Sequence, residues 1–177
     1  MTNELQLHQI SVSEMDNNCY LLQAGKEGLL IDAADNAPAI LDMAREAGVK
    51  ITAVLTTHRH WDHVRALEEV LSETDATHYA SFLDSPAIPA NVDVELRDGD
   101  TIDFASLPLP VRILRGHTPG GAALIATVEG ITNLFVGDSL FPGGLGKTTS
   151  EGDFVRLYKD VTGRIFDEFP DLSLIHI

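Results

Sequence analysis

Three histidines lie within six consecutive residues, with an aspartate among them: His58, His60, Asp62 and His63. Neutral imidazole nitrogens and carboxylate oxygens are ligands that zinc and related divalent ions take in proteins. His58 and His60 are two residues apart, so both side chains project to the same side of an extended backbone. The spacing predicts a metal site, with Asp62 and His63 serving a second ion or supporting the first. The alternative is a surface loop that is merely rich in histidine.

Two later segments have the same local form, an apolar run that ends in a residue able to bind a metal. Residues 111–114 lead into Arg115-Gly116-His117, and residues 134–136 lead into Gly137-Asp138. Taken alone, Asp138 is typical of a turn or a helix cap. Beside the histidine cluster, His117 and Asp138 become the favoured remaining ligands.

The histidine cluster falls between a strand and a helix. Residues 51–56 are apolar and β-branched, which is typical of a buried strand. After the cluster, an apolar stripe at helical spacing predicts an amphipathic helix: Val64, Leu67, Val70 and Leu71. Ligands at a strand end are held rigidly while their loop faces solvent, so this junction favours a functional site.

Strands predominate along the rest of the chain. Turn residues and β-rich runs predict strands over residues 5–12, 19–23, 28–31, 111–114, 122–128, 131–136 and 172–177. Residues 92–96 and 101–104, separated by Asp98-Gly99-Asp100, are predicted as a hairpin-like pair.

Two further helices are indicated by their caps. One begins after Asp35 or Asn36 and ends at Gly48, and a longer one begins near Ser150. We expect one domain over residues 1–177, with two packed sheets and helices outside them, although another α/β sandwich fits the same periodicity.

The composition excludes several classes of function. A formal charge of −15, with only 12 Lys and Arg among 177 residues, predicts no nucleic-acid partner. No apolar run approaches the ~20 residues that cross a bilayer, so no membrane partner is expected. The N-terminus shows no signal peptide and the single cysteine, Cys19, cannot form an internal disulfide, which favours the cytoplasm. Cys19 is predicted to be a small core residue; the alternative is a reactive thiol.

Five motifs then occur in a characteristic order: Asp16-Asn17-Asn18-Cys19-Tyr20, Ile31-Asp32, the histidine cluster, Gly116-His117-Thr118-Pro119-Gly120, and Gly137-Asp138-Ser139-Leu140-Phe141. With these motifs the chain resembles the metallo-β-lactamase superfamily, and within it the glyoxalase-II-like (hydroxyacylglutathione hydrolase-like) branch. The resemblance implies an α+β fold, the four-layer αββα sandwich of two mixed β-sheets flanked by helices. It places the site at one edge of the two sheets.

The resemblance also implies a role for each candidate residue. His58, His60 and His117 would bind a first ion, Asp62 and His63 a second, and Asp138 would bridge both. Asp32 would organise the ligand loops, as outer carboxylates commonly do. The expected metal is zinc, with iron or manganese as alternatives.

The implied activity is hydrolysis of a small-molecule ester or thioester substrate by a metal-activated water. No side-chain nucleophile is needed, which agrees with the absence of a Gly-x-Ser-x-Gly sequence. Asp62 is a candidate catalytic residue that takes a proton during turnover. Lys147 lies in the segment that contributes to substrate binding in this branch, and is a candidate partner for a substrate carboxylate; the alternative is an ordinary solvated lysine.

One departure from the family concerns the end of the chain. The family's last ligand comes from a Gly-His-Gly-like loop after the final strand, whereas this sequence stops at residues 174–177. His176 precedes the expected position, so no ligand role is assigned to it. We expect a chain shortened at its C-terminus, with the second ion site incomplete.

Two alternatives to a hydrolase follow. One is a mononuclear iron, persulfide dioxygenase-like oxidoreductase, and the other is a non-catalytic metal-binding domain. An antibiotic β-lactamase is disfavoured because no export signal is visible, and RNA processing is disfavoured by the acidity.

Overall fold

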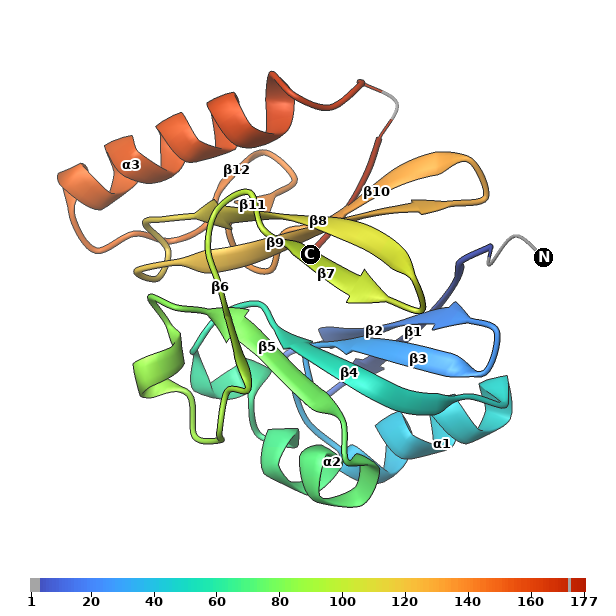
Figure 1. The fold of residues 1–177 in the computed structure, drawn as a ribbon. Helices are drawn as coiled ribbons and strands as arrows, with labels where there is room; N and C mark the ends of the chain where they lie inside the picture. The colour runs from blue at the N-terminus through green and yellow to red at the C-terminus, as the bar shows by residue number, and fades with distance from the viewer. Residues whose placement is uncertain (1–3, 172) are drawn as a thin grey trace.

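The computed structural model describes residues 4–171 and 173–177. Two β-sheets pack face to face. The helices α1 (Ala37–Ala47) and α2 (Leu67–Thr74) cover the outer face of one sheet, and α3 (Glu151–Val161) covers the outer face of the other (Figure 1). These layers form an αββα sandwich, so the fold predicted from the sequence is confirmed.

The first sheet has the strand order β1-β2-β3-β4-β5-β6. Its strands are β1 (Gln6–Val12), β2 (Asn17–Ala24), β3 (Glu27–Ile31), β4 (Lys50–Thr56), β5 (Thr77–Ser81) and β6 (Val94–Leu96). From β1 to β3 neighbours are antiparallel, and from β3 to β6 they are parallel. The loop after β4 therefore leaves the carboxyl end of parallel strands, where binding residues of such sheets commonly lie.

The second sheet has the order β13-β10-β9-β8-β7. Its strands are β7 (Thr101–Phe104), β8 (Leu107–Leu114), β9 (Gly121–Val128), β10 (Ile131–Phe135) and β13 (Leu174–His176). A small separate hairpin, β11 (Leu140–Phe141) and β12 (Gly144–Leu145), follows β10. Because β9 is antiparallel to both β8 and β10, the ends of β8 and β10 meet at one edge of the sheet.

The main core lies between the two sheets. Leu22 and Leu55 of the first sheet and Val111, Leu124 and Phe135 of the second are fully buried there. Separate apolar clusters lie beneath α1 and α2 and beneath α3. Burial of such side chains stabilises the fold by roughly 1.5–3 kcal/mol each.

Both ends of α1 and the start of α3 lie at the residues that the sequence indicates, whereas α2 begins at Leu67, so that Val64 of its predicted stripe lies outside the helix. The side chain of Asn36 accepts a hydrogen bond from the backbone of Ala39 at 3.3 Å, and Gly48 ends α1 with φ of 72°. Ser150 caps α3 by accepting from the backbone of Asp153 at 3.1 Å. Beyond Val161 the chain passes into a π-helical turn, Thr162–Phe166, so the regular α-helix spans 11 residues and is no longer than α1.

The hairpin-like pair predicted over residues 92–104 is wrong. β6 pairs in parallel with β5, and β7 pairs with β8, so residues 97–100 cross from one sheet to the other. The turn residues stabilise this crossing: the Asp98 carboxylate accepts from the backbone of Ile113 at 2.9 Å, and Gly99 donates to the carbonyl of Val111 at 3.1 Å. An Asp-Gly turn has no local feature that selects a strand's partner, and tertiary packing made the selection here.

Three smaller predictions have plain outcomes. Cys19 is fully buried in the core, and burial raises the pKa of its thiol to about 11. The strand predicted over residues 172–177 is β13, and residue 172 lies outside the described residues. Within the described part of the chain, no helix is long and apolar enough to span a membrane.

Candidate metal centre

The ligand loops of the two sheets meet at one edge of the sandwich. The loop after β4 carries His58 and His60 and continues into a 3₁₀ turn, Trp61–His63. The loop between β8 and β9 carries His117. One ring nitrogen from each of His58, His60 and His117 lies within 4.8 Å of the others. The structure therefore brings together the three residues assigned to a first ion.

A second group lies beside the first. One ligand atom from each of Asp62, His63 and Asp138 lies within 4.8 Å of the others. Asp138 Oδ1 is 3.3 Å from His63 Nε2, and Asp138 Oδ2 is 3.7 Å from the Nε2 atoms of both His58 and His117. Asp138 therefore faces both groups, and all six candidate ligands converge on one place.

Three of the imidazole rings have a hydrogen-bond partner at Nδ1. His63 Nδ1 donates to Asp32 Oδ2 at 2.7 Å, and His117 Nδ1 donates to the carbonyl of Lys147 at 2.7 Å. His58 Nδ1 donates to the Thr57 hydroxyl at 3.0 Å. In a neutral ring this arrangement leaves the lone pair on Nε2, the atom that faces Asp138. For His58 and His117 the partners thus leave an Nε2 lone pair facing a common centre.

Asp32 supports two of these rings from behind. Its carboxylate accepts hydrogen bonds from the backbone and the hydroxyl of Thr57, both at 2.7 Å, as well as from His63. The residue is buried and has φ of 61°, a region that aspartate tolerates better than most residues. Asp32 therefore touches His63 directly and His58 through Thr57.

The pKa of His63 shifts in the opposite direction from the pKa values of His58 and His60. Burial lowers the pKa of His58 well below its usual value and also lowers the pKa of His60, which keeps both rings in the neutral form that binds metals. Burial alone would lower the pKa of His63 as well, but the carboxylates of Asp32 and Asp138 outweigh it and raise that pKa to about 10. Burial opposes ionisation of Asp138, yet the neighbouring histidines hold its pKa below the usual value. In the metal-free protein His63 and Asp138 thus form an ion pair.

The residues present fit a divalent ion. Among residues 4–171 and 173–177, the buried Nε2 atoms of His58 and His117 have no hydrogen-bond partner. Most buried polar atoms in proteins are paired, so two unpaired lone pairs beside a carboxylate indicate a missing electron-pair acceptor. A set of imidazole nitrogens and carboxylate oxygens suits zinc, and it also suits iron or manganese.

The segment that follows the hairpin of β11 and β12 packs against His117 and Asp138. Gly146, just after β12, donates to the carbonyl of Ser139 at 3.0 Å. A Cβ at Gly146 would overlap the carbonyl oxygen of Asp138 and lie 3.4 Å from His117 Cγ, so only glycine fits. Lys147 comes next and contacts His117 through its backbone carbonyl, while Lys147 itself is exposed. The substrate role assigned to its side chain stays a prediction.

Sequence reasoning missed the supporting contacts of Asn17 and Thr57. Asn17 Nδ2 donates to Asp62 Oδ2 at 3.0 Å and lies 3.5 Å from His63 Nε2. The sequence predicts a turn over residues 15–18, but the turn ends at Asp16 and Asn17 begins β2. Nothing local points to a partner of Asn17 that lies 45 positions away. Thr57 carries no signal beyond its place next to His58.

His176 lies away from the candidate ligands. Its Nε2 atom is 2.7 Å from Asn133 Oδ1, and its ring stacks on Phe135 with 4.8 Å between the centroids. Both contacts belong to the sheet, where β13 pairs with β10. This position agrees with the absence of a ligand role for His176.

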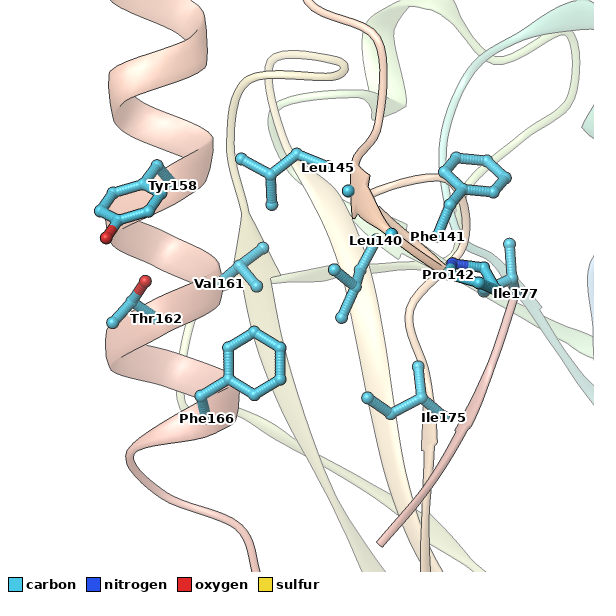
Figure 2. A pocket seen from close by; sticks show the side chains of 12 residues that line it. Leu140, Phe141, Pro142, Leu145, Tyr158, Val161, Thr162, Phe166, Ile175 and Ile177 are labelled. Atoms are coloured by element: carbon cyan, nitrogen blue, oxygen red, sulfur yellow. The ribbon is translucent and has the colours of Figure 1, made fainter. Parts of the chain in front are cut away.

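An apolar pocket of about 480 Å³ lies behind the hairpin, on the α3 side of the second sheet. Figure 2 shows side chains from three places around it: Leu140 and Leu145 of the hairpin, Val161 and Phe166 of α3 and the π-helical turn after it, and Ile175 of β13. None of the six candidate ligands lines this pocket. The metal centre and the apolar pocket are thus separate features joined by the hairpin.

Comparison with known proteins agrees with this geometry. The family model of the metallo-beta-lactamase superfamily matches residues 12–169. The chain is 36% identical over 135 residues to a hydroxyacylglutathione hydrolase of Gloeobacter violaceus, an overlap of 75% of this chain and 52% of the relative. The chain therefore spans about half the length of the curated relatives it matches.

Solved structures share the fold. BLEG-1, a B3 metallo-beta-lactamase, superposes with a TM-score of 0.86 over 96% of this chain and 90% of its own, and its 22% identity supports the fold alone. TTHA1623, solved in a di-iron-bound form, has a TM-score of 0.81 and 27% identity, over 96% of this chain and 90% of its own. With a family model that spans most of its length, the chain belongs to the metallo-beta-lactamase superfamily.

Proposed function

We propose that the chain is a metal-dependent hydrolase of a small-molecule ester or thioester, built as one domain over residues 1–177. The observation that carries the proposal is the convergence of two ligand groups on Asp138, whose Oδ2 lies 3.7 Å from the buried Nε2 atoms of His58 and His117. The curated relatives named hydroxyacylglutathione hydrolase support this class of reaction.

The six converging residues divide into two proposed ion sites. His58, His60 and His117 would hold one ion, Asp62 and His63 would hold another, and Asp138 would contribute to both. Ions of this kind lower the pKa of a water toward neutrality and polarise a carbonyl oxygen. Zinc suits this donor set. Iron and manganese are alternatives, and the relative solved in a di-iron-bound form supports iron.

Asp62 is the proposed proton acceptor. Asn17 donates to its Oδ2 at 3.0 Å, which holds the carboxylate in one orientation, and the same oxygen lies 3.5 Å from His63 Nε2. A general base has to be held within reach of the proton that it takes, and this contact supplies that constraint. Lys147, exposed beside the loop that holds His117, is the proposed partner of a substrate carboxylate.

The test combines metal analysis with an assay of thiol release. Metal-free protein is reloaded with zinc, iron or manganese separately, and free thiol is followed with acyl thioesters of small thiols. We expect turnover by the loaded protein and a loss of at least about 100-fold in His117→Ala. His8→Ala is the matched control, because His8 lies on β1 and bonds to Gln23 instead of a ligand.

Two outcomes contradict the hydrolase. Stoichiometric metal binding with no hydrolysis of any ester or thioester favours a non-catalytic metal-binding domain. Oxygen consumption by iron-loaded protein with a persulfide favours the dioxygenase-like alternative. A single ion on the three nitrogens of His58, His60 and His117 is what that alternative requires, and the convergence of these nitrogens supports it.

A further inference from the structure

The first proposed ion site depends on two loops that belong to different sheets. His58 and His60 follow β4 of the first sheet, whereas His117 follows β8 of the second. Their ring nitrogens converge to within 4.8 Å only if the two loops keep a fixed spacing. Side chains of the ligands themselves cannot set this spacing, because each imidazole is attached to its own loop.

A buried carboxylate joins these two loops. Asp84, which is 1% exposed, lies between β5 and the 3₁₀ turn Ser85–Ala87. Its Oδ2 accepts a hydrogen bond from the backbone of Arg59 at 3.0 Å, and its Oδ1 accepts from the backbone of Gly120 at 2.9 Å. Arg59 is the residue between His58 and His60, and Gly120 is three residues after His117.

We propose that Asp84 is a positioning residue that holds the two ligand loops at the spacing required by the first ion site. The inference rests on the proposed metal centre. Each oxygen of one carboxylate bonds to one loop, so the length of a carboxyl group sets the distance between Arg59 and Gly120. Hydrogen bonds from backbone amides to a buried carboxylate are charge-assisted and directional, which suits this task.

The surroundings of Asp84 restrict its own movement. Its backbone donates to the carbonyl of Ser81 at 3.1 Å, and its carbonyl accepts from Ala87 at 3.0 Å. A Cβ at Gly120 would lie 2.7 Å from Ser81 Oγ and 2.8 Å from Leu83 Cβ, so this loop packs directly against the segment that carries Asp84. The carboxylate is therefore a fixed support and not a mobile surface group.

A second hydrogen bond joins the two loops but does not duplicate the role proposed for Asp84. The backbone of Ala122 donates to the carbonyl of Thr57 at 2.8 Å, which joins the bases of the two loops. Thr57 precedes the ligands and Ala122 follows the glycines, so this bond constrains the strand ends. Asp84 acts further along, where the loops carry the ligands.

The test uses Asp84→Asn, which keeps the side-chain shape but leaves one acceptor oxygen, and Asp84→Ala, which removes both. Val128→Ala is the control for lost stability, since Val128 is buried at the opposite end of β9. In metal-free protein we expect amide hydrogen exchange at Arg59 or Gly120 to accelerate about tenfold in Asp84→Asn, at both in Asp84→Ala, and at neither in the control. This readout involves no metal, so it stands even if the proposed function fails.

Metal binding gives the second readout. Cobalt(II) loaded in place of the native metal reports ligand geometry through its visible absorption bands. We expect weaker affinity, by about 10- to 100-fold, together with altered bands in both Asp84 variants, and neither change in Val128→Ala. Weaker affinity with unchanged bands and unchanged amide exchange would mean that Asp84 contributes only its charge. That result, or wild-type behaviour in Asp84→Ala, overturns the proposal.

Discussion

Thr57 illustrates how a single uncharged residue organises the candidate site. Its backbone and hydroxyl both donate to Asp32, and its hydroxyl accepts from His58 Nδ1. The hydroxyl thus connects a candidate ligand to a buried carboxylate 25 positions earlier in the chain. The ligands themselves can be identified from sequence because their chemistry is unusual at that density. Thr57 cannot, because threonine is ordinary at a strand end and its partner is distant in sequence.

Replacing Thr57 with valine tests this connection. The substitution keeps the β-branched shape but removes the hydroxyl that fixes the His58 tautomer. It also removes one of the hydrogen-bond donors to Asp32 Oδ2. We expect metal affinity to fall about 10- to 100-fold, measured by competition with a chromophoric chelator. Thr56→Val is the matched control, because the Thr56 hydroxyl lies 2.7 Å from His78, which is not a candidate ligand. Equal affinities in the two variants would contradict the role of Thr57.

At the scale of elements, local sequence signals identified what depends on local structure. The caps Asn36 and Gly48 delimit α1 because a helix end is satisfied by residues next to it. The pairing of β6 could not be identified in the same way, because the strand's partner, β5, is short and itself carries no strong pattern. The contact between Lys147, just after the hairpin β11–β12, and His117 is equally non-local.

The hairpin should depend strictly on Gly146. A methyl group at this position would overlap the Asp138 carbonyl, so the hairpin must shift and carry the Lys147 carbonyl away from His117. We expect Gly146→Ala to lower the free energy of unfolding by about 3 kcal/mol, measured by urea denaturation, and to weaken metal binding as well. Gly144→Ala in the same hairpin is the control, since nothing lies within 4 Å of a Cβ there. A stable Gly146→Ala protein with normal metal affinity would show that the hairpin does not support the site.

The attachment of α3 to the second sheet should depend on pH through Asp160. Its carboxylate accepts from the backbone and guanidinium of Arg115 at 2.9 and 2.8 Å and lies 3.2 Å from the guanidinium of Arg164. Burial would raise the pKa of Asp160, but the bonds from Arg115 outweigh it and hold the pKa below the ordinary value near 3.8. A carboxyl group with a depressed folded pKa stabilises the protein above its unfolded pKa, and this stability is lost as the pH falls through the folded value.

Asp160→Asn should therefore cost about 2 kcal/mol at pH 7, and the difference from wild type should shrink toward pH 3. Urea unfolding of the metal-free proteins at both pH values measures the effect. Asp42→Asn is the control, because Asp42 pairs with Arg45 on the exposed side of α1 and surface pairs contribute little. A difference that does not change with pH would contradict the assignment of this stability to ionised Asp160.

At the scale of the whole molecule, the candidate site is shared between two sheets that are formed by successive halves of the chain. Asp62 and His63 follow β4 in the first half, and His117 and Asp138 follow β8 and β10 in the second. The order of the motifs allowed the fold to be predicted, since a family fixes which strands carry them. The closeness of the two sheets that carry the loops follows instead from the apolar core between them, which contains residues such as Leu55 and Phe135. No local pattern in the sequence encodes that approach.

Because its ligands come from both sheets, a bound ion should stabilise the sandwich as a unit. A ligand that binds only the folded state adds about 2.7 kcal/mol when its free concentration is 100 times its dissociation constant. We expect the unfolding midpoint of the protein to rise on addition of zinc and to return to its starting value with a chelator. His117→Ala removes the second sheet's nitrogen from the first group, so its gain at the same zinc concentration should be much smaller. An equal gain in wild type and His117→Ala would mean that zinc is held by the loop after β4 alone, and that the two sheets are not joined through the metal.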